Sequence, residues 1–94
     1  MEIRFLIDPE TRLPHIFEHG VTEKEVTEIL RRPGEDRAGN EDSRVALGQT
    51  VAGRYLKVIY VRDPVGDGVF VITAYDLEGK PLTAYRRRQR RRRR

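Results

Sequence analysis

A change in the spacing of apolar residues near residue 43 constrains the fold of this chain more than any other feature. Before that point the sequence carries one helical repeat, formed by Val26, Ile29 and Leu30. Thr22 and Glu25 form a capping box at its start, and Pro33-Gly34 stops it. We therefore predict one helix over residues 22–32, with strands following it.

Period-two alternation after that point predicts a β-meander. Residues 44–51 and 54–61 alternate, and Ala52-Gly53 offers a tight turn between them, so these two segments predict a hairpin. The apolar run over residues 69–75 is continuous and fits a strand that is covered on both faces. Residues 33–43 hold glycine, proline and mostly polar or charged residues, which predicts a mobile loop before the three antiparallel strands.

Each end of the chain adds one element. Residues 2–7 alternate and predict an N-terminal strand, and Pro14 leaves residues 9–18 irregular or briefly helical. Pro81, at a first helical position, predicts a short C-terminal helix. The predicted fold class is α+β: an N-terminal strand and one or two helices packed on an antiparallel sheet of three to four strands, with a short C-terminal helix that leads into an arginine-rich tail.

Length and composition exclude several classes of protein. A chain of 94 residues is long enough for one domain and too short for two. No stretch approaches the roughly 18 apolar residues of a membrane-spanning helix, and the N-terminus lacks the pattern of a secretory signal, so we expect a cytoplasmic protein. The absence of cysteine excludes disulfides and sulfur-based zinc sites, and two histidines alone predict no structural metal centre. We expect neither a metal nor a cofactor.

The charge of the chain is divided unevenly. Eight of the 19 Lys+Arg residues fall within residues 86–94, which contain no acid. Residues 1–85 hold the other eleven against 15 Asp+Glu, so a domain of net charge about −4 carries a tail of +8 at residues 86–94. Such a tail predicts binding to a polyanion, with RNA or DNA as the obvious partner. Alternatively, it is a solvated terminus, folds back on the acidic domain, or is an added segment that resembles the arginine-rich peptides of viral transactivators.

Histidine, tyrosine and arginine are the residue types available for RNA cleavage in this chain. Metal-free cleavage needs one group that takes the proton of the ribose hydroxyl, another that protonates the leaving oxygen, and cations that hold the phosphate. His19 has a side chain type that titrates near neutrality, and Arg44 and Arg54 flank the predicted hairpin, so these three are candidate catalytic residues. The alternatives are that His19 caps the turn before the helix and that both arginines are ordinary surface charges.

Aromatic and basic residues near the C-terminus are candidates for RNA binding, because rings stack on bases and guanidinium groups bind phosphates. They are Tyr75, Tyr85, Arg86, Arg87, Arg88, Arg90 and Arg91. Gly48 shares a strand face with Arg44, where a missing side chain would let an RNA backbone approach the sheet. A strand tyrosine is alternatively a core residue. Glu18 and the acidic residues of the first helix have no visible partner carboxylate, so we assign them no chemistry.

The order of three motifs resembles a known family. The chain runs from HGVTEKEVTEILRRP through SRVALGQTVAGRYLKVIYV to VFVITAY and a basic end. In this it resembles the BrnT-type toxins and an adjoining small domain family of unknown function, within the RelE/ParE-like superfamily. The resemblance implies helices packed on an antiparallel sheet and a ribonuclease that inhibits translation and is held inactive by an antitoxin. Its site would use His19, Arg44 and Arg54, with Tyr60, on the exposed side of the sheet.

Two departures from this family's pattern keep other functions open. The toxins commonly have a lysine before the His-Gly pair and an arginine after the serine-alanine of the last strand, where this chain has Glu18 and Thr73-Ala74-Tyr75. Losing such a cation costs about 3–4 kcal/mol of transition-state stabilisation unless the arginine tail replaces it. Three functions therefore compete: a toxin-like, metal-independent ribonuclease with a cognate antitoxin, a non-catalytic RNA-binding domain of the same fold, and a protein-interaction domain.

Overall fold

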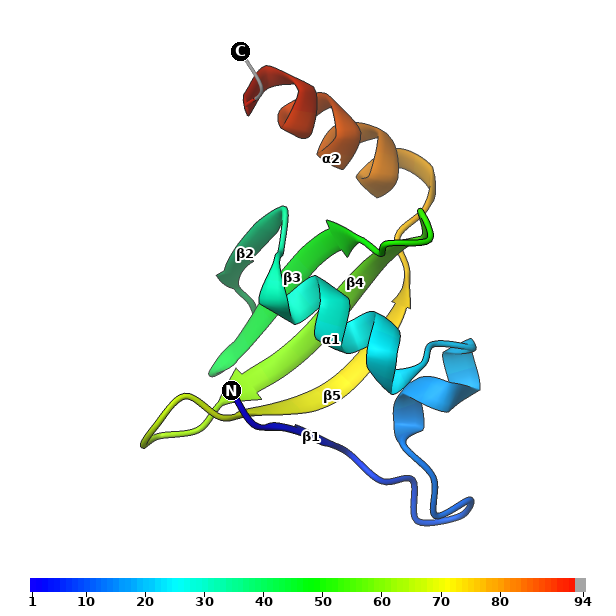
Figure 1. Ribbon diagram of the computed structural model, residues 1–94, viewed down its shortest axis with the longest axis vertical. Helices are drawn as coiled ribbons and strands as arrows, with labels where there is room; N and C mark the ends of the chain where they lie inside the picture. The colour runs from blue at the N-terminus through cyan, green and yellow to red at the C-terminus, as the bar shows by residue number, and fades with distance from the viewer. Residues whose placement is uncertain (93–94) are drawn as a thin grey trace.

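The computed structural model describes residues 1–92 and, within them, shows two α-helices and a five-stranded mixed sheet (Figure 1). The elements are β1 (Ile3–Phe5), the 3-10 helix η1 (His15–His19), α1 (Glu23–Arg31), β2 (Glu35–Ala38), β3 (Ser43–Gln49), β4 (Tyr55–Arg62), β5 (Val69–Asp76) and α2 (Gly79–Arg92). The predicted α+β class is confirmed. Residues 93 and 94, the end of the predicted tail, lie outside the described part of the chain. Within that part, neither α-helix combines the length and the apolar character needed to cross a lipid bilayer.

The sheet has the order β1-β5-β4-β3-β2 and differs from the predicted one at both edges. The antiparallel meander of β3, β4 and β5 is confirmed. The N-terminal strand, however, pairs in parallel with β5, with Ile3 opposite Val69. In addition, β2 forms within residues 33–43, which we predicted to be a loop, and pairs antiparallel with β3. The prediction of an antiparallel sheet of three to four strands was therefore wrong. The sequence of β2, Glu-Asp-Arg-Ala, carries no apolar alternation, and no local pattern gives the direction in which β1 pairs.

Helix α1 is the predicted one, and it covers one face of the sheet. The hydroxyl of Thr22 accepts a hydrogen bond from the Glu25 N–H at 3.1 Å, and the Glu25 carboxylate accepts one from the Thr22 N–H at 2.9 Å, which confirms the capping box. The helix buries Val26 and Ile29. A Cβ atom placed on Gly48 would lie 3.1 Å from Ile29 Cδ1. The interpretation of Gly48 as a place for an RNA backbone was therefore wrong, because α1 occupies that space.

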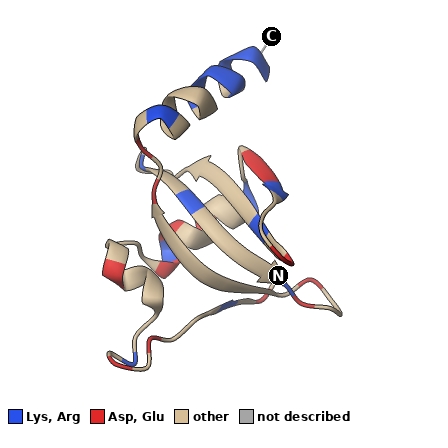
Figure 2. Ribbon diagram, turned by 180° about the vertical axis from the view of Figure 1, so that it is seen from behind, with Lys and Arg blue, Asp and Glu red and all other residues tan. Residues whose placement is uncertain are grey.

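The two faces of the sheet are covered differently. The face toward α1 carries the main core, which comprises Ile16, Val21, Val26, Ile29, Ala46, Leu56, Val58, Tyr60, Val69, Val71 and Ala74. On the other face a smaller cluster of Leu47, Leu77 and Tyr85 joins one end of the sheet to α2. Within residues 1–92 no helix covers the middle of this second face, which Figure 2 shows from its own side. We call it the open face. Lys57 and Tyr75 lie on it as cross-strand partners, and neither is fully buried.

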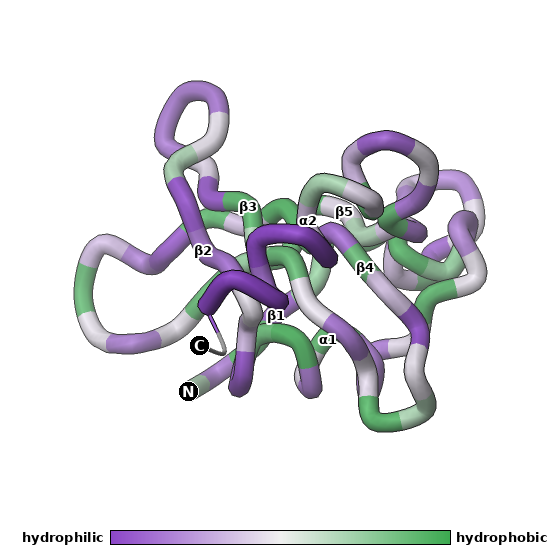
Figure 3. Tube along the Cα trace, turned by 90° about the horizontal axis from the view of Figure 1, so that it is seen from above, coloured by the Kyte–Doolittle hydropathy of each residue, from purple (hydrophilic) through white to green (hydrophobic). Residues whose placement is uncertain are grey.

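Helix α2 is longer than the short helix predicted and has no break at residue 85. It runs from Gly79 through Arg92 and crosses the end of the sheet, hydrophilic along most of its length (Figure 3). Tyr85 is only 4% exposed. A Cβ atom on Gly34 would lie 1.8 Å from the Tyr85 hydroxyl oxygen, so the Tyr85 ring can pack here only because Gly34 has no side chain. Within residues 86–92, the predicted tail is thus the continuation of a helix that is docked on the domain.

Candidate nucleic-acid interface

Four arginines form one exposed face of α2, a helix along which Figure 2 shows several basic positions in blue. We call Arg86, Arg87, Arg90 and Arg91 the arginine face. The helical repeat of 3.6 residues places them together on the side of α2 away from Tyr85. Arg86 lies over the ring of Tyr55 at 5.8 Å. Among residues 1–92 the other three have neither an ion pair nor a hydrogen bond from their side chains, so their guanidinium groups are available to an external anion.

The opposite side of α2 holds the helix to the domain. Arg88 donates to both oxygens of Glu35, at 2.5 Å from Nε and 2.9 Å from Nη2, and this pair lowers the pKa of Glu35. Gln89 and Arg92 donate to the carbonyl oxygen of Gly34 at 3.2 and 2.9 Å. Tyr85 is buried beside them. Arg88 and Tyr85 were predicted to bind RNA. In this structure Tyr85 is buried, and Arg88, whose side chain is 39% exposed, docks α2 through Nε and Nη2.

Tyr75 joins two clefts on the open face. One cleft, of about 330 Å³, lies beside α2 and is lined by residues that include Arg37, Lys57 and Tyr75. The Lys57 ammonium lies 5.8 Å from the centroid of the Tyr75 ring. The other cleft, of about 620 Å³, is lined by residues that include His15, His19 and Tyr75. The rings of His19 and Tyr75 are 5.8 Å apart, so the structure brings together two residues that the sequence had singled out separately.

Arg54 reaches the neighbourhood of His19, but its guanidinium group is already occupied. Nε donates to Asp76 at 2.7 Å, Nη1 donates to the Gly20 carbonyl at 2.8 Å and to Glu25 at 3.1 Å, and Nη2 donates to the His19 carbonyl at 3.3 Å. These bonds use four of its five N–H groups. The hydrogen bond from Arg54 lowers the pKa of Asp76. Arg54 therefore fixes the C-terminal end of η1, where His19 lies, and one of its N–H groups is left for any other ligand.

Arg44 and Tyr60 lie on the α1 face of the sheet and not on the open face. Arg44 Nε donates to Asp36 Oδ1 at 2.9 Å, and the Tyr60 hydroxyl donates to the other oxygen of Asp36. Tyr60 is 3% exposed, and burial together with the neighbouring Asp36 raises its pKa. The set predicted from the family resemblance, with His19, Arg44, Arg54 and Tyr60 on the exposed side of the sheet, is therefore divided between the two faces. Strand alternation alone indicates this, since Arg44 and Tyr60 share a face with the buried Val58.

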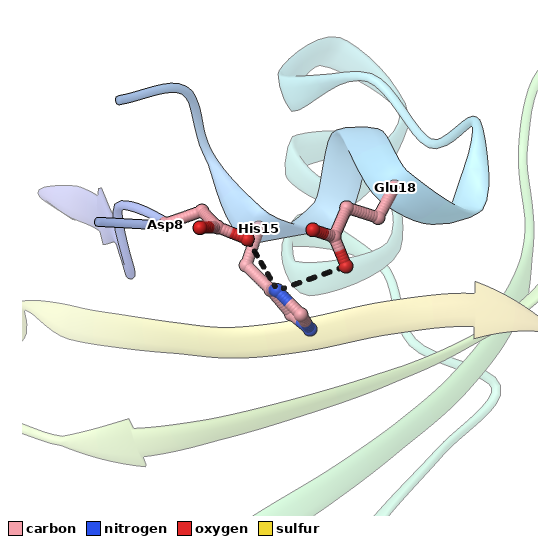
Figure 4. A group of neighbouring side chains, drawn as sticks. All are labelled: Asp8, His15 and Glu18. Carbon is pink, nitrogen blue, oxygen red and sulfur yellow. Dashed lines mark ion pairs between the residues drawn. The ribbon is translucent and has the colours of Figure 1, made fainter. Parts of the chain in front are cut away.

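A second group of polar side chains lies beside the His19 cleft (Figure 4). His15 Nδ1 is 3.7 Å from Asp8 Oδ2 and 3.6 Å from Glu18 Oε2. The hydrogen bond with Asp8 raises the pKa of Glu18, and the same bond lowers the pKa of Asp8. Glu18 therefore has the partner carboxylate that the sequence had not revealed. The ligand atoms of these three side chains all lie within 4.8 Å of one another.

Comparison with known proteins identifies no relative of this chain. No protein-family model matches the chain, and neither does any curated protein or any solved structure. The resemblance to the BrnT-type toxins thus stays a prediction from sequence motifs.

Proposed function

We propose that this protein binds single-stranded RNA between the arginine face of α2 and the open face of the sheet, and that it does so without cleaving the RNA. One observation carries the proposal. Arg88 of α2 lines a cleft together with Lys57 and Tyr75, and the exposed arginines that have no partners in residues 1–92 lie on the same helix. Guanidinium and ammonium groups bind phosphates, and an exposed aromatic ring stacks on an unpaired base. Single-stranded RNA offers both groups in the same short segment.

The distribution of charge supports an elongated anionic ligand. Residues 1–85 carry a net charge of about −4, and the positive charge is concentrated on α2. A polyanion is attracted to α2 and repelled by much of the remaining surface, so the field orients it along the helix. Arg37 and Lys57 extend this positive surface from α2 onto the open face. The expected contact is therefore a strand that follows α2 and turns a base toward Tyr75.

Binding without cleavage fits the contacts better than a metal-independent ribonuclease does. Cleavage would need His19 together with cations that face the phosphate. Of the four residues predicted to be catalytic, His19 alone lines a cleft on the open face. Arg54 is engaged by carboxylates and carbonyls, and Arg44 and Tyr60 are bound to Asp36 on the opposite face.

A toxin-like ribonuclease is the second candidate, and the placement of His19 favours it. Its ring lies 5.8 Å from Tyr75 and 5.7 Å from His15, so a proton donor and a proton acceptor are both present at one cleft. This candidate predicts that the protein cuts RNA in the presence of a chelator and that His19→Ala abolishes the cut. Intact RNA after prolonged incubation with a large excess of protein would favour binding alone.

Salt-dependent binding tests the proposed function directly. Fluorescence anisotropy of a labelled single-stranded RNA is measured from 50 to 200 mM KCl with the full chain and with Arg87, Arg90 and Arg91 all changed to Gln. Three lost phosphate contacts reduce the slope of log K against log salt by about 2. The matched control changes Lys24, Arg31 and Arg32 to Gln, which removes the same charge from exposed positions at α1. Equal losses in both triple variants, or no binding even at 50 mM KCl, would reject the proposal.

A further inference from the structure

We infer that Asp8, His15 and Glu18 form a binding site for a divalent transition-metal ion of the Zn²⁺ type. The site is separate from the arginine face, and it does not depend on the proposed binding of RNA. Its side chains come from two segments, since Asp8 follows β1 and the other two residues lie on η1. All three side chains point toward one another in Figure 4.

The distances within the group fit a metal ion. Zn²⁺ binds imidazole nitrogen and carboxylate oxygen at about 2.0–2.2 Å, so two ligand atoms of a tetrahedral site lie about 3.4 Å apart. His15 Nδ1 is 3.7 Å from the nearest Asp8 oxygen and 3.6 Å from the nearest Glu18 oxygen. All three ligand atoms lie within 4.8 Å of one another. Small side-chain rotations are therefore enough to bring them onto one ion.

The backbone holds the ligands in this arrangement. Asp8 Oδ1 accepts a hydrogen bond from the Glu10 N–H at 2.9 Å, which leaves Oδ2 facing His15. The Asp8 N–H donates to the Leu13 carbonyl at 2.9 Å and closes the loop. In a 3-10 helix, residues three apart lie on the same side, so η1 places Glu18 directly beside His15. A hydrogen bond to the ligating carboxylate is also the kind of support that orients metal ligands in proteins.

Ligand type and charge select the class of ion. Imidazole nitrogen suits Zn²⁺ and its first-row neighbours, whereas Mg²⁺ and Ca²⁺ prefer sites built from oxygen alone. Two carboxylates balance the charge of one divalent ion. The Glu18 side chain is 48% exposed, so a fourth position is open to water, as in zinc sites with three protein ligands.

Metal titration of the full chain tests the site. The protein is treated with chelator, exchanged into chelator-free buffer and titrated with ZnCl₂ by calorimetry and with CoCl₂ by visible absorption. We expect one equivalent to bind at micromolar concentration, and Co²⁺ to give the d–d absorption of a site with nitrogen and oxygen ligands. Weak binding of several equivalents, or a Co²⁺ spectrum that matches the aqueous ion, overturns the proposal.

Matched variants locate the ion. We expect Asp8→Asn, His15→Gln and Glu18→Gln each to weaken Zn²⁺ binding by at least about tenfold. Loss of a residue that only supports a metal ligand already weakens binding by about 10- to 100-fold. Glu10→Gln removes a charge from the same loop, and His19→Gln removes the other histidine; both retain binding. Because Asn at position 8 still offers an oxygen to the Glu10 N–H, the loop keeps its shape, and thermal unfolding without metal checks this. If His19→Gln costs as much affinity as His15→Gln, or if the three ligand variants bind like the wild type, the assignment is wrong.

Discussion

Arg88 on α2 binds Glu35 on β2 through both carboxylate oxygens, at 2.5 and 2.9 Å, across 53 residues of sequence. This pair joins the C-terminal helix to the edge strand of the sheet. It divides the arginines of α2 into two groups, because Arg88 and Arg92 face the domain while the arginine face points away from it. Arginines that look alike in the run over residues 86–92 therefore have different roles, and single substitutions can distinguish these roles.

Arg88→Gln and Arg90→Gln remove the same charge from the two sides of α2. We expect Arg88→Gln to lower the free energy of unfolding by a small but measurable amount, since the pair is partly exposed and solvent screens it. Arg90→Gln leaves stability unchanged and weakens RNA binding. Urea unfolding measures the first effect, and a double-mutant cycle with Glu35→Gln isolates the coupling between the two residues. Equal effects of the two substitutions on stability would contradict the docking role of Arg88.

The sequence predicts those elements whose apolar pattern is local. The meander and α1 follow from alternation and helical spacing within each segment. β2 has the sequence Glu-Asp-Arg-Ala and carries no such pattern, so only the free edge of β3 explains why it is a strand. The parallel pairing of Ile3 with Val69 joins residues at opposite ends of the chain, and no local signal encodes that direction.

Arg54→Lys tests whether this arginine positions the segment around His19. A lysine ammonium cannot reach Asp76, Glu25 and two carbonyls at once, because it lacks the planar fork of the guanidinium group. We expect a loss of about 2–3 kcal/mol in the free energy of unfolding. Arg62→Lys, at an exposed arginine that lies 4.0 Å from Asp36, changes stability by less than about 0.5 kcal/mol. If the two variants unfold at similar denaturant concentrations, Arg54 does not position the segment around His19.

Acid weakens the fold through carboxylates that are paired with arginine. The pKa values of Glu35 and Asp76 are lowered by hydrogen bonds from Arg88 and Arg54. Each pair therefore stabilises the folded state above the ordinary pKa of the carboxyl group, and this contribution is lost as the pH falls through the lowered value. We expect the free energy of unfolding to decrease with acidification below about pH 4. Urea titrations at several pH values measure this free energy, and we expect it to fall less steeply with acid in Arg88→Gln. The same dependence of the free energy of unfolding on pH in that variant and in the wild type would contradict the pairing of Arg88 with Glu35.

At the candidate sites, the sequence predicts positions within one strand or helix but not contacts between separate elements. Lys57 lies between Leu56 and Val58 on β4, and its side chain points to the other face of the sheet from theirs. The two-residue repeat of the strand alone therefore identifies Lys57 as a residue of the open face. By contrast, Asp8 meets Glu18 across the loop that joins β1 to η1, a relationship that the tertiary structure alone fixes. Sequence patterns show which side of an element a residue occupies, but not which distant element comes to lie against it.

Tyr75→Leu tests base stacking on the open face. Stacking on an aromatic ring contributes about 1–3 kcal/mol per base, so this change weakens binding of single-stranded RNA by about 5-fold to 150-fold. Tyr75→Phe keeps the ring and retains affinity. The slope of log K against log salt stays the same in both variants, because stacking releases no counterions, and this separates the effect from loss of the arginine face. Anisotropy with the same labelled RNA measures all three proteins. Wild-type affinity in Tyr75→Leu would place the base elsewhere.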